Sequence, residues 1–307
     1  MMLSKKSNVS SKSQSMRSAQ HAILKTLLYS DLFSFPLTKD ELWKYLISDT
    51  YLPQDIFMRA LQALENNSRV ASLNGYYCLP HATAGIANRE DHSSLVNKRL
   101  EEAKKTAKLL SMIPTIEYIG LSGSLAAGDV RSHDDIDLFI ITKANTLFST
   151  RLLIHAILGS NRRKPLQTSA PGKVCINLLV DTLAISWPRN ERDVYVAREI
   201  AQLKPMFDRN NTYETFIKKN TWVRSFLPNA FDTLSPVLLH NKLSIPLYFP
   251  HIFEKIIRFI QISYMKKKRT TETVSPHRLA FHPGNYRSKI LAEFQAKERD
   301  QDSLTTP

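Results

Sequence analysis

Glycine and cysteine are both scarce in this chain, which has 8 glycines and 2 cysteines among its 307 residues. The cysteines, Cys78 and Cys175, are far apart and lie in apolar runs. This arrangement argues against a disulfide framework or a zinc site and is typical of the reducing cytoplasm, where we expect this protein. Three of the glycines fall within Gly120–Thr142, beside the densest acidic cluster of the chain. That stretch is therefore the first candidate for chemistry.

Long apolar runs are also absent. The first twenty residues lack the apolar central segment of a secretory signal, so residues 1–19 are predicted to form a disordered basic tail, with a serine-rich transit peptide as the alternative. Residues 243–265 are the most hydrophobic later stretch, but Pro246, Pro250 and Glu254 interrupt it. We predict no transmembrane helix, because a span needs about 20 uninterrupted apolar residues.

Acidic residues are too few to balance the basic ones. The chain has 42 Lys and Arg against 28 Asp and Glu, which gives a net charge of +14. Such an excess favours polyanionic partners, namely nucleic acid, nucleotide or an anionic membrane surface. The length allows two domains, and the ordinary hydrophobic content of 43% allows a sizeable core.

Residues 20–80 predict a small helical domain. A first amphipathic helix begins near His21, a capping box of Thr38 and Glu41 opens a second, and a third follows Pro53. The pair Asn74-Gly75 then lies between two short β-prone runs, which indicates a hairpin. Three helices and a hairpin describe a winged-helix-like arrangement, and residues 81–94 would form a linker.

The role of this domain is left open between two alternatives. Its third helix carries Arg59 as its basic residue, whereas a helix that reads a DNA groove usually shows several Arg, Lys, Asn or Gln side chains. We favour a structural or substrate-positioning role, and DNA binding through the winged helix is the alternative.

Residues 93–207 predict an α/β layer with a small mixed sheet. Helical periodicity over residues 95–113 is followed by β-prone runs at 116–123, 137–142 and 173–180, with helices at 146–157 and 192–207. The fold class expected for the chain is therefore α+β, with this core flanked by the N-terminal domain and a C-terminal helical region.

The acidic cluster contains a pair with metal-binding geometry. Asp135 and Asp137 lie two residues apart at the start of a buried strand, so both side chains point to the same face. Paired carboxylates bind Mg²⁺ or Mn²⁺, ions that also take oxygen ligands from phosphates. Gly123 lets the backbone approach a phosphate closely, and Ser124 offers an N–H and a hydroxyl. One face could thus hold a metal and a nucleoside triphosphate together.

These residues carry a family resemblance. Gly123-Ser124, ten intervening residues and Asp135-Ile136-Asp137-Leu138 resemble the Gly-Ser and Asp-x-Asp pattern of the DNA polymerase β-type nucleotidyltransferase superfamily. The segments Val196–Pro205 and Phe281–Pro283 are similar to a subgroup of bacterial nucleotidyltransferase-domain proteins. The resemblance implies that Gly123 and Ser124 bind the triphosphate and that Asp135 and Asp137 bind the metal.

The family generally has a third carboxylate on a neighbouring strand, and here the pattern departs. The polar position within residues 173–180 is Asn177, which is neutral and cannot act as a base. Asp181 shares its parity but lies roughly 13 Å farther along the strand, so it is a weak catalytic candidate. The nearby Asp134, His133 and Arg131 are expected in the loop.

Residues 208–296 predict mostly helix, and residues 297–307 a frayed tail. We expect one face of the amphipathic helix at 252–269 to cover the catalytic layer, and an interfacial membrane role is the alternative. The residues expected on the inward face are Ile252, Ile256, Phe259 and Ile260.

The function expected from these observations is Mg²⁺-dependent transfer of a nucleoside monophosphate from an NTP to an acceptor hydroxyl. The acceptor is open among a small molecule, RNA and a protein side chain. The alternative is a non-catalytic, DNA-binding regulator in which a degenerate nucleotidyltransferase fold senses nucleotide. A third is the sensor half of a toxin–antitoxin pair.

Overall fold

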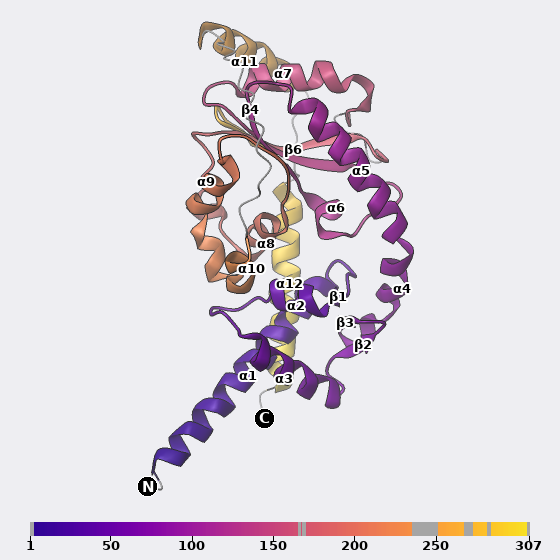
Figure 1. The fold of residues 1–307 in the computed structure, drawn as a ribbon, viewed down its shortest axis with the longest axis vertical. Coiled ribbons are helices and arrows are strands. Elements are labelled where there is room, and N and C mark those ends of the chain that lie inside the picture. Colours follow the sequence, from indigo (N-terminus) through magenta and orange to yellow (C-terminus); the bar gives the residue numbers. More distant parts are fainter. Residues whose placement is uncertain are drawn as a thin grey trace.

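The computed structural model describes residues 3–164, 167, 170–234, 251–266, 273–280 and 284–305 (Figure 1). The chain is a mixed α and β protein, as predicted, with a six-stranded sheet in the order β7-β4-β5-β6-β9-β8. The strands of this sheet are β4 (Ile116–Leu121), β5 (Ile136–Thr142), β6 (Val174–Asp181), β7 (Lys204–Asp208), β8 (Thr273–Val274) and β9 (Arg278–Ala280).

The two central strands of this sheet are parallel and its other pairs are antiparallel. β5 pairs with β6 in parallel, whereas β4 pairs antiparallel with both β5 and β7. Every residue of β5 except Asp137 is buried. Strands covered on both faces carry continuous apolar runs, which is why residues 138–141 read as an unbroken apolar segment.

Helices cover both faces of the sheet. One face packs on α5 (Ser93–Leu110) and α7 (Leu147–Leu158), through an apolar cluster that includes Ala107, Leu138 and Ile154. The other face packs on α8 (Val194–Gln202) and α9 (Thr212–Lys219), through a cluster that includes Phe139 and Phe216. α10 (Pro228–Asp232) follows α9 on this side.

The second cluster continues into the N-terminal helices, so the sheet and the N-terminal part share one core. The N-terminal elements are α1 (Leu3–Asp31), α2 (Lys39–Lys44), α3 (Gln54–Asn66) and a three-stranded antiparallel sheet of β1 (Leu37–Thr38), β3 (Tyr76–Cys78) and β2 (Ala71–Leu73). The predicted capping box is present, since the Thr38 N–H donates to Glu41 Oε2 at 2.8 Å. The predicted hairpin is present too, with Asn74 and Gly75 at positive φ between Leu73 and Tyr76.

Two segments predicted without regular structure are helical. α1 already begins at Leu3, inside the stretch predicted to be a disordered tail over residues 1–19. Part of this stretch packs on the protein, because Met16 and Ala19 contact the apolar core and Ala19 is only 1% exposed. Much of the linker predicted at 81–94 is α4 (Ala84–Asp91), whose Ile86 is buried.

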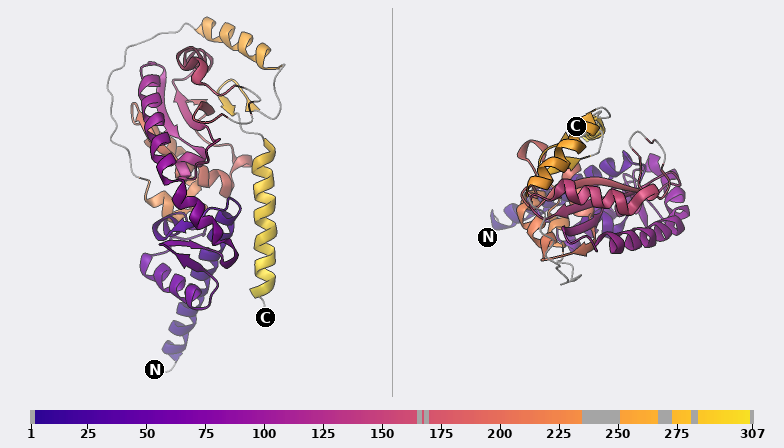
Figure 2. Two further views of the ribbon diagram at one scale, coloured as in Figure 1. Left: turned by 90° about the vertical axis from the view of Figure 1, so that its right-hand side faces the viewer. Right: turned by 90° about the horizontal axis from the view of Figure 1, so that it is seen from above.

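The C-terminal part also departs from prediction. The segment predicted as one helix over 192–207 is α8 followed by strand β7, and the region predicted as mostly helical contributes β8 and β9 to the main sheet. The last helix, α12 (Gly284–Thr305), continues through the predicted frayed tail. Ion pairs hold it to α1, because Lys297 binds Asp31 and Glu298 lies 2.6 Å from Lys25. Figure 2 shows α12 running along the N-terminal helices.

The orientation of α11 (His251–Lys266) is opposite to the prediction. Ile252, Ile256, Phe259 and Ile260 do not cover the sheet, because each is at least half exposed. The inward side of the helix instead carries Glu254, which is only 8% exposed. Glu254 and Gln261 hydrogen-bond the first turn of α7, and Ile257, Ile262 and Met265 face inward beside them.

Among the described residues no helix combines the length and the apolar character that a membrane span requires. The predicted basic end of α11 at Lys267–Arg269 and the segment Phe281–Pro283 lie outside the described residues.

Candidate functional site

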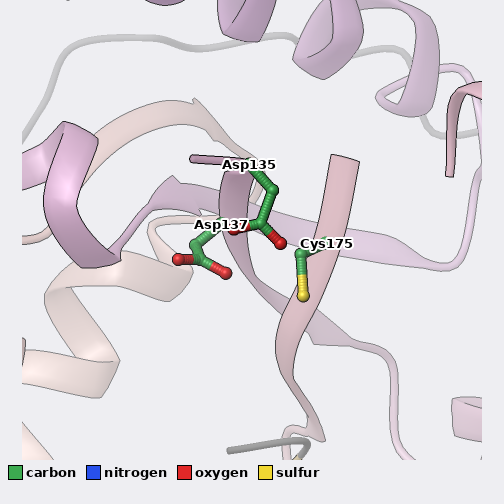
Figure 3. A group of neighbouring side chains, drawn as sticks. All are labelled: Asp135, Asp137 and Cys175. Carbon is green, nitrogen blue, oxygen red and sulfur yellow. The ribbon is translucent and has the colours of Figure 1, made fainter. Parts of the chain in front are cut away.

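The two aspartates of the acidic pair lie at the beginning of β5. Asp135 directly precedes the strand and Asp137 is its second residue. β6 runs beside them in parallel and pairs Cys175 with Asp137. The ligand atoms of Asp135, Asp137 and Cys175 all lie within 4.8 Å of one another (Figure 3). The strand register therefore brings a thiol, rather than a third carboxylate, next to the pair.

The Gly123-Ser124 pair lies against these carboxylates. α6 (Gly123–Ala127) begins at Gly123, whose φ of +65° belongs to the left-handed region. A Cβ on Gly123 would overlap the Asp137 carboxylate, so a side chain here is excluded by both the backbone conformation and the space. The Ser122 N–H donates to the Asp137 carbonyl at 2.9 Å and ties the start of α6 to β5.

The loop aspartate Asp134 organises the turn between α6 and β5. The Ser124 hydroxyl donates to Asp134 Oδ2 at 3.1 Å, and the Arg131 N–H donates to the same oxygen at 3.0 Å. His133 Nε2 lies 3.6 Å from Asp134 Oδ1. Asp134 is therefore a structural part of the loop, and its contact with Ser124 positions that hydroxyl beside the aspartate pair.

The site strongly opposes a second negative charge. Burial, and then the neighbouring Asp135 carboxylate, raise the pKa of Asp137 well above its ordinary value, while a hydrogen bond from the Cys175 thiol acts in the opposite direction. Burial and the two carboxylates likewise raise the pKa of Cys175, which keeps it a thiol at neutral pH. Crowded carboxylates of this kind are relieved by a bound cation.

One positively charged side chain, that of Arg163, contacts the aspartate pair. Arg163 Nη1 donates to Asp135 Oδ2 at 2.8 Å, and the rest of its guanidinium donates to the Gln167 carbonyl. The Arg163 N–H also donates to the Val174 carbonyl, which places this arginine beside the start of β6. Arg163 thus neutralises Asp135 but makes no described hydrogen bond to Asp137.

An irregularity in β6 changes which residues face the site. The register pairs Leu138 with Ile176 and Phe139 with Leu178, so Asn177 is an extra residue between them. Asn177 is buried and donates to the Ser122 hydroxyl at 3.3 Å. Beyond this bulge the parity of β6 is inverted, which pairs Asp181 with Thr142 on the face opposite to Asp137.

Asp181 is therefore not part of the site, in contrast to the prediction that it is a weak catalytic candidate. Its carboxylate is fully buried and accepts hydrogen bonds from the Asn145 N–H at 2.9 Å and the Leu183 N–H at 3.0 Å. Its Oδ2 also lies 2.7 Å from His277 Nδ1, next to β9. Asp181 holds the loops at the far end of the central strands.

The aspartate pair opens into a cleft of about 260 Å³. Its walls come from three parts of the chain, since Phe33 and Phe35 follow α1, Ser124 lies on α6 and Glu199 lies on α8. Five carboxylates reach the cleft, from Asp129, Asp134, Asp135, Asp137 and Glu199. Arg198 is the one basic side chain among its described lining residues. An anionic ligand can enter such a cleft only together with cations.

Glu199 and Arg198 are the site residues that sequence reasoning missed. Burial raises the pKa of Glu199 to about 7, although Arg198 lowers it. Arg198 is 5% exposed, with its guanidinium 4.0 Å from the Tyr45 ring centroid and Nη1 donating to the Tyr45 carbonyl at 3.2 Å. The one available signal was a pair of adjacent charges, Arg198-Glu199, inside an otherwise apolar helix, where charged residues are rare without a partner or a role.

A second cavity of about 190 Å³ adjoins the cleft and shares Tyr195, Glu199 and Tyr286 with it. Its lining is mostly apolar and includes Trp187 and Arg278. The Arg278 guanidinium lies 4.5 Å from the Trp187 ring centroid. Trp187 Nε1 and Arg278 Nε are buried and without a hydrogen-bond partner among the described residues. Both atoms lack exposed surface, so the character of the cavity comes from its mostly apolar lining, which suits an apolar part of a ligand.

Comparison of the chain with protein-family models, with curated proteins and with solved structures found no match.

Proposed function

We propose that this protein is a divalent-metal-dependent nucleotidyltransferase, which moves a nucleoside monophosphate from an NTP to an acceptor hydroxyl with release of pyrophosphate. The observation that carries the proposal is the contact of Gly123 with Asp137, whose carboxylate lies beside that of Asp135. It combines a backbone approach that excludes a Cβ with two crowded carboxylates at the start of one strand.

The residues fit Mg²⁺ or Mn²⁺ better than a softer metal. Asp135 and Asp137 supply the oxygen ligands that these ions prefer, whereas the raised pKa of Cys175 disfavours the thiolate that a zinc site would use. When bound, such an ion neutralises triphosphate charge and polarises the reacting phosphate. Gly123 and Ser124 would bind the triphosphate, with the Ser124 hydroxyl positioned by Asp134.

Glu199 is the residue that we assign as the base. The resembled family generally uses a third carboxylate on a neighbouring strand, and here that place holds Cys175. Glu199 reaches the same cleft from α8, and its pKa of about 7 suits a group that must accept a proton at neutral pH. In this proposal Glu199 accepts the proton of the acceptor hydroxyl as the hydroxyl oxygen attacks the α-phosphate.

The adjoining apolar cavity is the place that we assign to the rest of the acceptor. It shares Glu199 with the cleft, so a molecule bound there would present a hydroxyl next to the base. Its mostly apolar lining, which includes Trp187, would pack against an apolar part of that molecule. The chemical class of the acceptor stays open among a small molecule, RNA and a protein side chain.

A DNA-binding regulator is the weaker alternative. The basic residue of α3, Arg59, is exposed but forms an ion pair with Asp55, and the apolar side of the helix packs into the core. This arrangement leaves little positive charge on the helix that would enter a groove. The N-terminal part instead supplies a wall of the cleft, which supports a positioning role for it.

The proposal is tested with NTPs labelled at either the α- or the γ-phosphate, incubated with Mg²⁺, the protein and fractionated acceptors. Nucleotidyl transfer predicts that the α-label, and not the γ-label, becomes attached to the acceptor. It also predicts that Asp137→Asn abolishes transfer. Asp49→Asn changes an exposed acid outside the cleft and should retain activity. Transfer of the γ-label, or full activity of Asp137→Asn, would refute the proposal.

The role of Glu199 has its own variant. Glu199→Gln should retain metal-dependent NTP binding and lose at least tenfold in transfer, because a positioned base contributes about 10²–10⁴-fold. Equal transfer by Glu199→Gln and the unmodified protein would exclude Glu199 as the base.

A further inference from the structure

α11 docks on the protein through Glu254 and Gln261, and beside them through the inward apolar residues Ile257, Ile262 and Met265, while its other large apolar side chains face outward. The Glu254 carboxylate accepts hydrogen bonds from the Phe148 N–H at 2.6 Å and the Ser149 N–H at 3.0 Å, both at the N-terminus of α7. Gln261 Nε2 donates to the Phe148 carbonyl at 2.8 Å. Glu254 and Gln261 lie seven residues apart, which is about two helical turns, and so share one face of α11.

The opposite face is apolar and open. Six large side chains of α11 are between 50% and 75% exposed, and they repeat at helical spacing along its length. These residues, which we call the outer face of α11, are Ile252, Phe253, Ile256, Phe259, Ile260 and Tyr264. A monomeric protein rarely leaves a contiguous apolar surface of this kind in water, so the outer face marks an interaction site.

The charges around the outer face are of one sign. The only acid in the sequence of α7 and α11 is Glu254, and it is turned inward. Lys255 is exposed on α11, Lys266 ends the helix, and the sequence continues with Lys267, Lys268 and Arg269, whose placement lies outside the described residues. Among the described side chains of α7 and α11, the outer face thus has the exposed Lys255 beside it and no outward acid, which complements a surface that is apolar inside and anionic outside.

The position of α11 leaves this face accessible. α11 and α7 lie together at the end of the molecule opposite the N-terminus, as Figures 1 and 2 show. α7 adds the half-exposed Leu152 to the apolar surface of this end. A flat partner can therefore approach the outer face without meeting the N-terminal helices.

We propose that the outer face of α11 is a docking surface for anionic lipid bilayers, on which the helix lies in the interface with its apolar side chains inserted and Lys255 at the headgroups. The proposal does not depend on the nucleotidyltransferase function. A second copy of this chain is the competing occupant, and the experiment distinguishes the two.

The test is co-sedimentation of the full chain with vesicles of phosphatidylcholine alone or with added phosphatidylglycerol. The proposal predicts binding to the anionic vesicles, weak binding to the neutral ones, and a decrease with rising salt. The variant Ile256→Glu/Phe259→Glu should bind at least tenfold more weakly. The control Met58→Glu/Leu73→Glu removes two exposed apolar residues from the N-terminal part with the same charge change, and it should bind as the unmodified protein does.

A second variant distinguishes loss of the apolar face from misfolding. Phe259→Ser/Ile260→Ser changes two of the most exposed residues of the outer face without adding charge, and it should also lose anionic-vesicle binding while melting at an unchanged temperature. The proposal is overturned if the unmodified protein does not bind anionic vesicles or binds neutral vesicles equally well. It is also overturned if both outer-face variants bind anionic vesicles as strongly as the unmodified protein does. It is also overturned if light scattering shows a dimer that these variants dissociate.

Discussion

At the scale of single residues, the site depends on the glycine that begins α6. Gly123 and Gly128 both have positive φ, but a Cβ would overlap the Asp137 carboxylate only at Gly123, whereas Gly128 faces open space. Gly128→Ala should therefore cost about 1 kcal/mol of stability from backbone strain alone.

Gly123→Ala carries the same strain together with the clash, and we expect a loss of about 2–3 kcal/mol with weaker metal-dependent NTP binding. Urea unfolding of the two variants side by side measures the difference. Equal losses of stability in both would show that the contact between Gly123 and Asp137 does not constrain the site.

His155 provides the residue-scale prediction on pH. Burial, aided by Arg151 and Arg162, lowers the pKa of His155 from 6.5 to about 3. The unfolded chain therefore binds a proton below pH 6.5 that the folded chain does not, so this contribution to stability is complete above pH 6.5 and is lost as the pH falls.

Between pH 7 and pH 5 the loss attributable to His155 is about 1–2 kcal/mol, allowing for its partial exposure. His155→Gln should remove this part of the stability loss. Urea unfolding of the variant and the unmodified protein at pH 7 and pH 5 measures the difference. An identical pH dependence in the two proteins would contradict the assignment.

Residue-level prediction from sequence succeeded where spacing alone decides the geometry. Asp135 and Asp137 share a face because side chains alternate along any strand. Asp181 was predicted to share the face of Asn177, which is wrong because alternation was extended through Asn177, where β6 has a bulge. Cys175 was noted only as lying in an apolar run, since no local pattern reveals which residue a distant strand pairs with.

At the scale of elements, α11 is attached to the protein through Glu254, which caps the N-terminus of α7. Glu254 supplies hydrogen-bond acceptors to two N–H groups at the start of α7, and its negative charge is favoured at a helix N-terminus. The same contacts determine that the apolar side of α11 faces outward.

Glu254→Ala should weaken the docking of α11 by about 1–3 kcal/mol, because it leaves buried N–H groups unpaired. Hydrogen exchange should then become faster throughout α11 and in the first turn of α7, while β5 keeps its protection. The control Glu214→Ala changes a more exposed acid on α9 and should leave α11 unchanged. Unaltered exchange in α11 would show that Glu254 does not hold it.

Elements whose apolar residues repeat at a clear period could be predicted from the sequence, and elements without such a repeat could not. α3 and α5 repeat apolar residues at helical spacing over several turns. β7 contains Pro205 and was included in the preceding helix, although proline is acceptable there because β7 is an edge strand. β8 and β9 have two and three residues, too few to display alternation. β9 pairs with β6 across a long sequence separation, and β8 pairs with β9.

At the scale of the whole molecule, the N-terminal helices and the sheet share one apolar core. One apolar cluster includes Leu27 of α1, Phe139 of β5 and Phe294 of α12. The fully buried Asn229 of α10 adds polar contacts, accepting from the Leu52 N–H at 2.9 Å and donating to the Trp43 carbonyl at 3.1 Å.

We therefore predict a single cooperative unfolding transition for the described core. Asn229→Ala should lower its midpoint as a whole, because it removes the acceptor of the part-buried Leu52 N–H, at a cost of about 1–3 kcal/mol. Scanning calorimetry tests this directly. Two transitions, of which the variant shifts only one, would show that the N-terminal part unfolds independently.

The central claim concerns the aspartate pair, and calorimetric titration of NTPs with Mg²⁺ or Mn²⁺ tests it most directly. We expect binding that requires the metal, is retained in Asp49→Asn and is lost in Asp135→Asn/Asp137→Asn. Metal-independent binding, or binding that survives in the double variant, would contradict the claim that these carboxylates hold the metal and the triphosphate together.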